Sequence, residues 1–189
     1  AASVSSNETG SNVDSSTNAN FDIDEAGTND EVIVKSNSSN PSDSTLEVKD
    51  DAKSDWNTVL VFDIDTKDSV NDITLNDVFV DVAHTAGVSY ATLVDDARIT
   101  IDGKVIDSSI SDVASSSNTS AAATIDFNVD GDVVIKAGDR VTAKVELRFK
   151  SLAPANEGKT VTASVTAANA DQIDAEGSDT LTTSQLSGS

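Results

Sequence analysis

Residues 141–150 alternate strictly between apolar and polar side chains, and this run constrains the fold more than any other part of the chain. The odd positions from Val141 to Phe149 are apolar, and the even positions from Thr142 to Lys150 are polar. A helix would spread these side chains around its circumference, whereas a β-strand places one set on a core and the other in solvent. We therefore predict a strand whose odd-numbered side chains are buried between two stacked sheets.

Aspartate supplies 26 of the 33 acidic residues, and glutamate supplies only seven. Glutamate favours helices, whereas aspartate competes with the helix backbone and favours caps and turns. An acidic chain with this skew is expected to place its charge on strands and turns. The composition and the alternating run together predict an all-β fold.

Other short runs with a period of two predict further strands. In the first half of the chain these runs are 21–24, 31–35, 45–49, 58–65, 73–75 and 78–82. The run at 58–65 is apolar on both faces, which indicates a strand in the middle of a sheet. The alternation changes parity at Asn76-Asp77, where we expect a β-bulge or a tight bend. Residues 88–94 fit either a strand or a short helical turn.

Two Asp-Gly pairs predict tight hairpin turns, because this pair readily adopts the positive φ angles that a two-residue turn requires. Asp102-Gly103 would join residues 99–101 to 104–106, and Asp130-Gly131 would join residues 124–129 to 132–136. Beyond these hairpins we expect a loop at 108–123 that crosses between sheets, a weaker strand at 161–167, and a last pairing segment around Ile173 and Leu181. The pattern predicts an antiparallel β-sandwich, with jelly-roll and immunoglobulin-like topologies both open.

Residues 1–19 consist almost wholly of Ser, Asn, Thr, Ala and Gly. Such a segment buries too little apolar surface to offset its ordering entropy, so we expect a tail that is flexible alone or is held by a neighbouring subunit. Residues 20–189 are long enough for one core and are predicted to form a single β-sandwich domain.

The formal net charge of −21 argues against nucleic acid and anionic lipid as partners and favours cations. No run of 18 apolar residues occurs, so no membrane insertion is predicted. Cysteine is absent, which excludes disulfides and thiolate metal sites. The Ala-Ala start suits a chain that follows cleavage of a secretory signal, so we expect an extracellular location.

Four stretches resemble the Asp/Ser/Thr-rich β-sandwich modules of prokaryotic surface-layer-like and surface-filament proteins. They are 40–43 (NPSD), 55–60 (DWNTVL), 97–104 (ARITIDGK) and 135–141 (IKAGDRV). The resemblance covers roughly residues 20–189. It implies a structural role at the cell surface, and it carries no catalytic residue across.

One acidic run reproduces the opening half of a calcium-binding loop, with oxygen ligands on alternate residues and a glycine for the turn. The candidate ligands are Asp126, Asn128, Asp130 and Asp132. Ala137 stands where the closing bidentate glutamate would be. We favour a hairpin whose apolar residues from Ile125 to Val129 point inward, and we keep calcium as the second interpretation.

Three Asn-X-Ser/Thr triplets, at Asn7, Asn37 and Asn118, lie in Ser/Asn-rich stretches that should be exposed. They are candidate sites of N-glycosylation. A chain this rich in Asn, Ser and Thr also generates such triplets by chance.

No residue set specifies a reaction, and we predict that the protein is not an enzyme. A serine triad would have to use the sole histidine, His84, but no serine lies in a nucleophile-elbow motif. Aspartate pairs that could act as acid and base are common in any chain this acidic, so they carry little information. We expect an extracellular structural subunit that assembles with copies of itself by strand addition, with Phe21 and Ile23 as contact residues and calcium at the joints. The alternative is a monomeric module that binds a cell-surface glycan or another ligand through Trp56 and Tyr90, although packing of these two rings is favoured.

Overall fold

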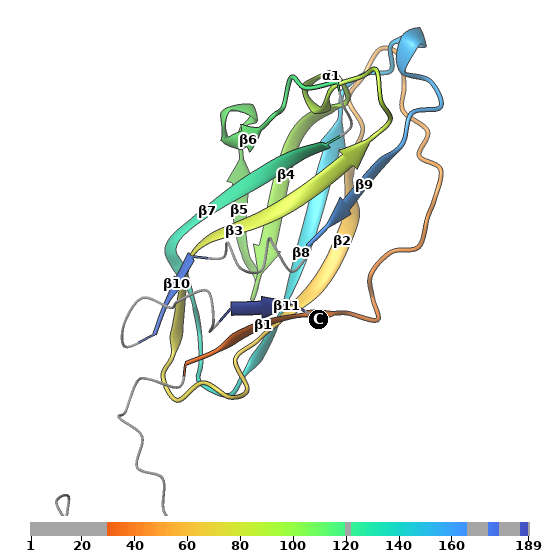
Figure 1. Ribbon diagram of the computed structural model, residues 1–189. Coiled ribbons are helices and arrows are strands. Elements are labelled where there is room, and N and C mark those ends of the chain that lie inside the picture. Colours follow the sequence, from red (N-terminus) through yellow and green to blue (C-terminus); the bar gives the residue numbers. More distant parts are fainter. Residues whose placement is uncertain (1–29, 120–121, 166–173, 178–185, 189) are drawn as a thin grey trace, which may run out of the picture.

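The computed structural model of the 189-residue chain describes residues 30–119, 122–165, 174–177 and 186–188. Its strands form two stacked sheets (Figure 1), which confirms the prediction of an all-β antiparallel sandwich. Phe21, Ile23, Ile173 and Leu181, together with the predicted tail at 1–19, lie outside the described residues. No helix of the described residues is both long and apolar enough to cross a membrane.

The first sheet has six strands in the order β11-β1-β2-β8-β4-β5. Their bounds are β1 (Val32–Ser36), β2 (Trp56–Asp65), β4 (Val94–Ile101), β5 (Lys104–Ser108), β8 (Arg140–Phe149) and β11 (Leu186–Gly188). Neighbours in this sheet are antiparallel except β1 and β11, which are parallel.

The second sheet has the order β10-β3-β7-β6, and a further strand, β9, also pairs with β3. The bounds are β3 (Ile73–His84), β6 (Val113–Ala114), β7 (Ala122–Ile135), β9 (Val161–Ser164) and β10 (Asp174–Glu176). Three short helical turns complete the described residues: α1 (Tyr90–Leu93), η1 (Ile110–Asp112) and η2 (Pro154–Asn156).

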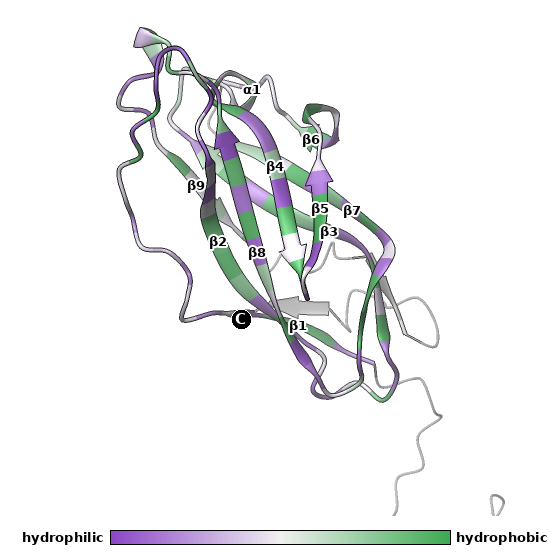
Figure 2. Cartoon of the chain, turned by 180° about the vertical axis from the view of Figure 1, so that it is seen from behind, coloured by the Kyte–Doolittle hydropathy of each residue, from purple (hydrophilic) through white to green (hydrophobic). Residues whose placement is uncertain are grey.

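The core lies between the sheets and is built from the inward residues of alternating strands, seen as bands of opposite hydropathy in Figure 2. Ala143, Val145 and Leu147 of β8 are fully buried, and Val141 and Phe149 pack against them at the strand ends. The predicted burial of the odd-numbered side chains is therefore confirmed. Since apolar burial is the dominant favourable term in folding, this alternation explains why residues 140–149 form a strand.

Several local predictions are confirmed by the register. β2 lies between β1 and β8, as its two apolar faces indicated. The pairing of β3 with β7 shifts between Leu75 and Asp77, where a bulge was expected. Asp102 and Gly103, at φ 48° and 79°, form the turn of the β4–β5 hairpin. Residues 88–94 contain the helical turn α1, and the crossing at 108–123 passes from β5 through η1 and β6 into the second sheet.

The predicted hairpin at Asp130-Gly131 is wrong, because β7 runs continuously and both of its halves pair with β3. The positive φ angles are present, at 49° and 74°, but they form a bulge instead of a chain reversal. Leu75 pairs with Val133, and Asp77 pairs with Asn128. Between these two pairs β3 has one residue, Asn76, whereas β7 has four, residues 129–132. The irregularity on β7 therefore lies opposite the bulge on β3, and both strands bend together in Figure 1.

The predicted strand at 45–49 is also wrong. These residues belong to the segment between β1 and β2, which bows away from the sandwich in Figure 1. Leu46 is 42% exposed, and the carbonyl of Lys49 accepts a hydrogen bond from the backbone N–H of Leu152 at 2.8 Å. Alternation over five residues does not by itself form a strand, and these residues pair with no strand of the described residues.

Candidate strand-addition edge and charged face

β2 is only partly covered on the side that faces away from β8. β1 pairs with it from Ser36 opposite Phe62 to Ile33 opposite Asp65. Over residues 56–61, no strand of the described residues lies on that side, and we call this stretch the β2 edge. The backbone N–H of Val61 donates to Oδ1 of Asn40 at 2.9 Å, so a side chain occupies the position next to the end of β1. Unpaired strand edges are templates for another strand.

A groove of about 250 Å³ lies between the β2 edge and β9, which is an outer strand of the second sheet. Its apolar lining comes from Val34, Leu60, Val61, Phe62, Ala163 and Val165. Polar side chains at its rim include Lys35, Asn37 and Ser164. We call this space the edge groove. It lies beside a strand edge with which no strand of the described residues pairs, and it offers apolar surface on which alternate side chains of an added strand can be buried.

The outward face of β8 carries a charged network. Arg98 Nε donates to Glu146 Oε2 at 2.8 Å, and Lys144 Nζ donates to Glu146 Oε1 at 3.1 Å. Glu146 is only 7% exposed. Burial alone would raise the pKa of Glu146, but the hydrogen bonds from Arg98 and Lys144 outweigh it and lower that pKa. The even-numbered side chains of β8 are therefore not all solvated, because Glu146 is buried beside two partly exposed cations.

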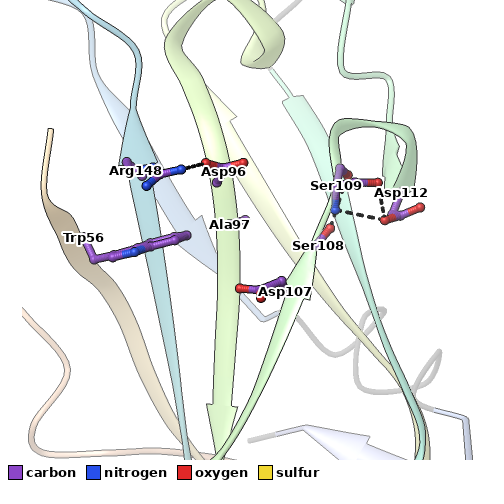
Figure 3. A pocket seen from close by; sticks show the side chains of 8 residues that line it. All are labelled: Trp56, Asp96, Ala97, Asp107, Ser108, Ser109, Asp112 and Arg148. Carbon is purple, nitrogen blue, oxygen red and sulfur yellow. Dashed lines mark hydrogen bonds and ion pairs between the residues drawn. The ribbon is translucent and has the colours of Figure 1, made fainter. Parts of the chain in front are cut away.

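Trp56 is part of the same face, because the Cζ atoms of Arg98 and Arg148 lie over its ring at 4.3 and 5.1 Å from the centroid. Beside it is a cavity of about 420 Å³. We call this the Trp56 pocket, whose lining includes Trp56, Asp96, Asp107, Ser109, Asp112 and Arg148 (Figure 3). Tyr90 is 2% exposed and belongs to the core, so it does not share a surface with Trp56.

Asp65 lies at the opposite end of β2 from Trp56, and only 2% of its side chain is exposed. Its Oδ2 accepts from Lys35 Nζ at 2.8 Å and from Arg140 Nε at 2.9 Å, and its Oδ1 accepts from the backbone N–H of Lys67 at 2.8 Å. The hydrogen bond from Lys35, helped by Arg140 and by the Lys67 N–H, lowers the pKa of Asp65 to about 2 despite its burial. Ionised Asp65 thus joins β1, β2 and β8.

The low pKa of Asp65 predicts a pH-dependent contribution to stability. In the unfolded chain Asp65 protonates near pH 3.8, and in the folded chain near pH 2, so its contribution is present above pH 3.8 and is lost as the pH falls through 2. Since Lys35 and Arg140 are partly exposed, we expect Asp65→Asn to lower the unfolding free energy by about 1–2 kcal/mol at pH 7 and by much less at pH 2. Urea unfolding at both pH values measures this. Exposed Asp68→Asn is the control, and an equal loss at both pH values would contradict the prediction.

The four candidate calcium ligands lie along β7. Asp126 and Asn128 are on its outward face, Asp130 is in the bulge, and the exposed Asp132 lies 3.0 Å from Lys104 in an ion pair. Burial, together with Asp77 and Asp112, raises the pKa of Asp126. The described residues contain no group of three or more His, Asp or Glu side chains placed to hold a metal ion. Calcium binding by these residues stays a prediction.

The candidate glycosylation sites differ in their surroundings. Nδ2 of Asn37, the atom to which a glycan would attach, donates to Asp63 Oδ1 at 2.6 Å. Asn118 is exposed, and its backbone N–H donates to the carbonyl of Ser115 at 2.8 Å. Asn7 is outside the described residues. A glycan on Asn37 would require loss of the bond to Asp63.

Comparisons with known proteins identify no family. No family model matches the chain, and no curated protein matches it. Among solved structures, AvmM, described as catalysing macrocyclization in alchivemycin A biosynthesis, aligns over 71% of each chain with 9% sequence identity and a TM-score of 0.34. Similarity at this level supports no inference about the activity of this chain.

Proposed function

We propose that this chain is an extracellular structural subunit that assembles with copies of itself into a surface filament or layer. The observation that carries the proposal is the β2 edge, which no strand of the described residues covers, beside the apolar edge groove. Assembly proceeds by strand addition, in which an extended segment of one copy hydrogen-bonds to the β2 edge of the next. The role is structural, and no catalytic step is part of it.

The occupant of the edge groove is the N-terminal segment of a second copy. Phe21-Asp22-Ile23-Asp24 alternates apolar and acidic residues, so a strand formed there presents Phe21 and Ile23 on one face. These side chains enter the apolar groove, while Asp22 and Asp24 face the solvent. The β2 edge spans residues 56–61, which is about 20 Å and matches a strand of about six residues.

Calcium favours assembly in this proposal, because each copy carries a net charge of −21 and copies of like charge repel one another. Carboxylates from two neighbouring copies together supply the several oxygen ligands that a calcium ion requires. Ligands from separate copies would meet only in the assembly. Chelation is therefore expected to weaken contacts between subunits without unfolding the sandwich.

Disulfide trapping tests the proposed contact, because the natural chain contains no cysteine. We expect an Ile23→Cys variant and a mass-tagged Ser164→Cys variant to form a mixed disulfide under mild oxidation. Ser164 lines the edge groove, and serine and cysteine are nearly the same size. Non-reducing electrophoresis resolves the mixed dimer from dimers of either variant alone.

The matched control pairs Ile23→Cys with a Val105→Cys variant instead of Ser164→Cys. Val105 is exposed on β5, at the opposite end of the six-stranded sheet. Equal trapping of the Val105→Cys and Ser164→Cys variants would contradict the proposed site. Electron microscopy tests the assembly itself, with and without calcium. Filaments or layers that survive both chelation and deletion of residues 1–24 would overturn the proposal.

A further inference from the structure

We propose that the Trp56 pocket binds a neutral carbohydrate. This site is separate from the edge groove, because no residue lines both cavities. Its volume of about 420 Å³ lies within the range of small-ligand sites, about 300–1,000 Å³. The inference does not rest on self-assembly and holds for an isolated copy of the chain.

The aromatic wall of the pocket is held in place by strands rather than by loops. Figure 3 shows Trp56 reaching from β2 across β8, with Asp96 of β4 and Asp107 of β5 on the far side. The guanidinium groups of Arg98 and Arg148 lie over the ring, and Arg148 is itself fixed by an ion pair with Asp96. The ring therefore needs little ordering when a ligand arrives, which favours binding.

The pocket offers a donor and an acceptor that the protein does not use. Among the described residues, neither the indole N–H of Trp56 nor the carboxylate of Asp107 has a hydrogen-bond partner, although both line the cavity. Asp107 is also exposed. A hydroxyl group both donates and accepts, so a ligand that carries several hydroxyl groups satisfies both sites at once.

The charge of the lining selects against anions. Asp96, Asp107 and Asp112 oppose the single guanidinium of Arg148, so the lining carries a net charge of −2, from three negative groups and one positive group. Phosphate, sulfate and uronic acids are repelled by this balance. A cationic amine is the competing ligand class, because it would pair with Asp107, but it has no use for the Trp56 N–H donor.

The sole tryptophan makes the test direct, because its emission reports on this pocket alone. The full chain is screened on an array of neutral glycans, then titrated with maltose, cellobiose, mannobiose and diacetylchitobiose while Trp56 emission is recorded. We expect saturable binding of at least one neutral saccharide. Asp107→Ala should weaken it about tenfold, the value of one hydrogen bond to a charged group.

Asp68→Ala is the matched control, since Asp68 is also an exposed aspartate but lies outside the pocket lining. The affinity of this variant for the saccharide should equal that of the natural chain. Trp56→Phe keeps a ring and removes the N–H donor, and it should weaken binding measured by calorimetry. The proposal is overturned if no neutral saccharide binds, if Asp107→Ala binds as well as Asp68→Ala, or if lysine amide shifts Trp56 emission while the saccharides do not.

Discussion

Phe127→Ala is expected to lower the free energy of unfolding by about 3–5 kcal/mol. Phe127 is the largest side chain that β7 places between the sheets, and it has no exposed surface. Its removal leaves a cavity that the two stacked sheets can only partly close, which adds to the lost transfer free energy. Because small domains are stable by only about 5–15 kcal/mol, this loss is a large share of the total. Urea unfolding followed by circular dichroism measures it.

Val134→Ala is the control for this prediction. Val134 lies on the same strand but points outward and is 47% exposed, so its truncation should change the unfolding free energy by less than about 0.5 kcal/mol. A Phe127→Ala variant as stable as Val134→Ala would contradict the placement of β7 against the six-stranded sheet.

The alternation of apolar and polar residues predicted those strands in which burial alone decides which side chains point toward the core. Residues 141–149 and the hairpin at Asp102-Gly103 are of this kind, because hydrophobic periodicity and a local turn preference decide them. The same Asp-Gly signal failed at Asp130-Gly131. Positive φ angles suit a bulge as well as a turn. A bulge forms here because both halves of β7 pair with β3, a strand that is distant in the sequence.

The charged face was harder to predict, since it depends on register. Alternation assigns Glu146 to the solvent side, whereas pairing of β8 with β4 places Arg98 opposite it and β2 brings Trp56 over the same strand. Positions 56, 98 and 146 give no local sign of this contact. The β2 edge could not be predicted either, because it also depends on which strands pair. The alternation at 45–49 predicted a strand, and the local sequence does not show that no strand of the described residues pairs with residues 56–61 on that side.

Asp30 bonds two parts of the chain together and lies against a third, which the sequence did not predict. It is 1% exposed, and its Oδ1 accepts the backbone N–H groups of Val70 and Asn71 at 3.2 and 2.9 Å. Nδ2 of Asn71 also donates to its Oδ2 at 3.0 Å. Gly177 lies so close that a Cβ built there would overlap Oδ2 of Asp30. The carboxylate thus bonds the start of β1 to the β2–β3 connection and lies against Gly177, the residue that follows β10.

Gly177→Ala is therefore expected to lower the free energy of unfolding by about 1–3 kcal/mol, since the buried carboxylate of Asp30 is displaced from its N–H donors. The added Cβ displaces a buried carboxylate from its donors, and the N–H groups of Val70 and Asn71 lose their acceptor. Asp30→Ala should lose a similar amount, because it leaves the same N–H groups unpaired. Thermal and urea unfolding of both variants measure these losses.

The double variant separates this contact from a general intolerance of alanine at position 177. Once Asp30 is replaced by alanine, the carboxylate that the new Cβ would meet is gone, so adding Gly177→Ala should cost much less than it costs the natural chain. We expect a coupling free energy of about 1–3 kcal/mol between the two positions. Strictly additive losses would show that Gly177 and Asp30 do not meet.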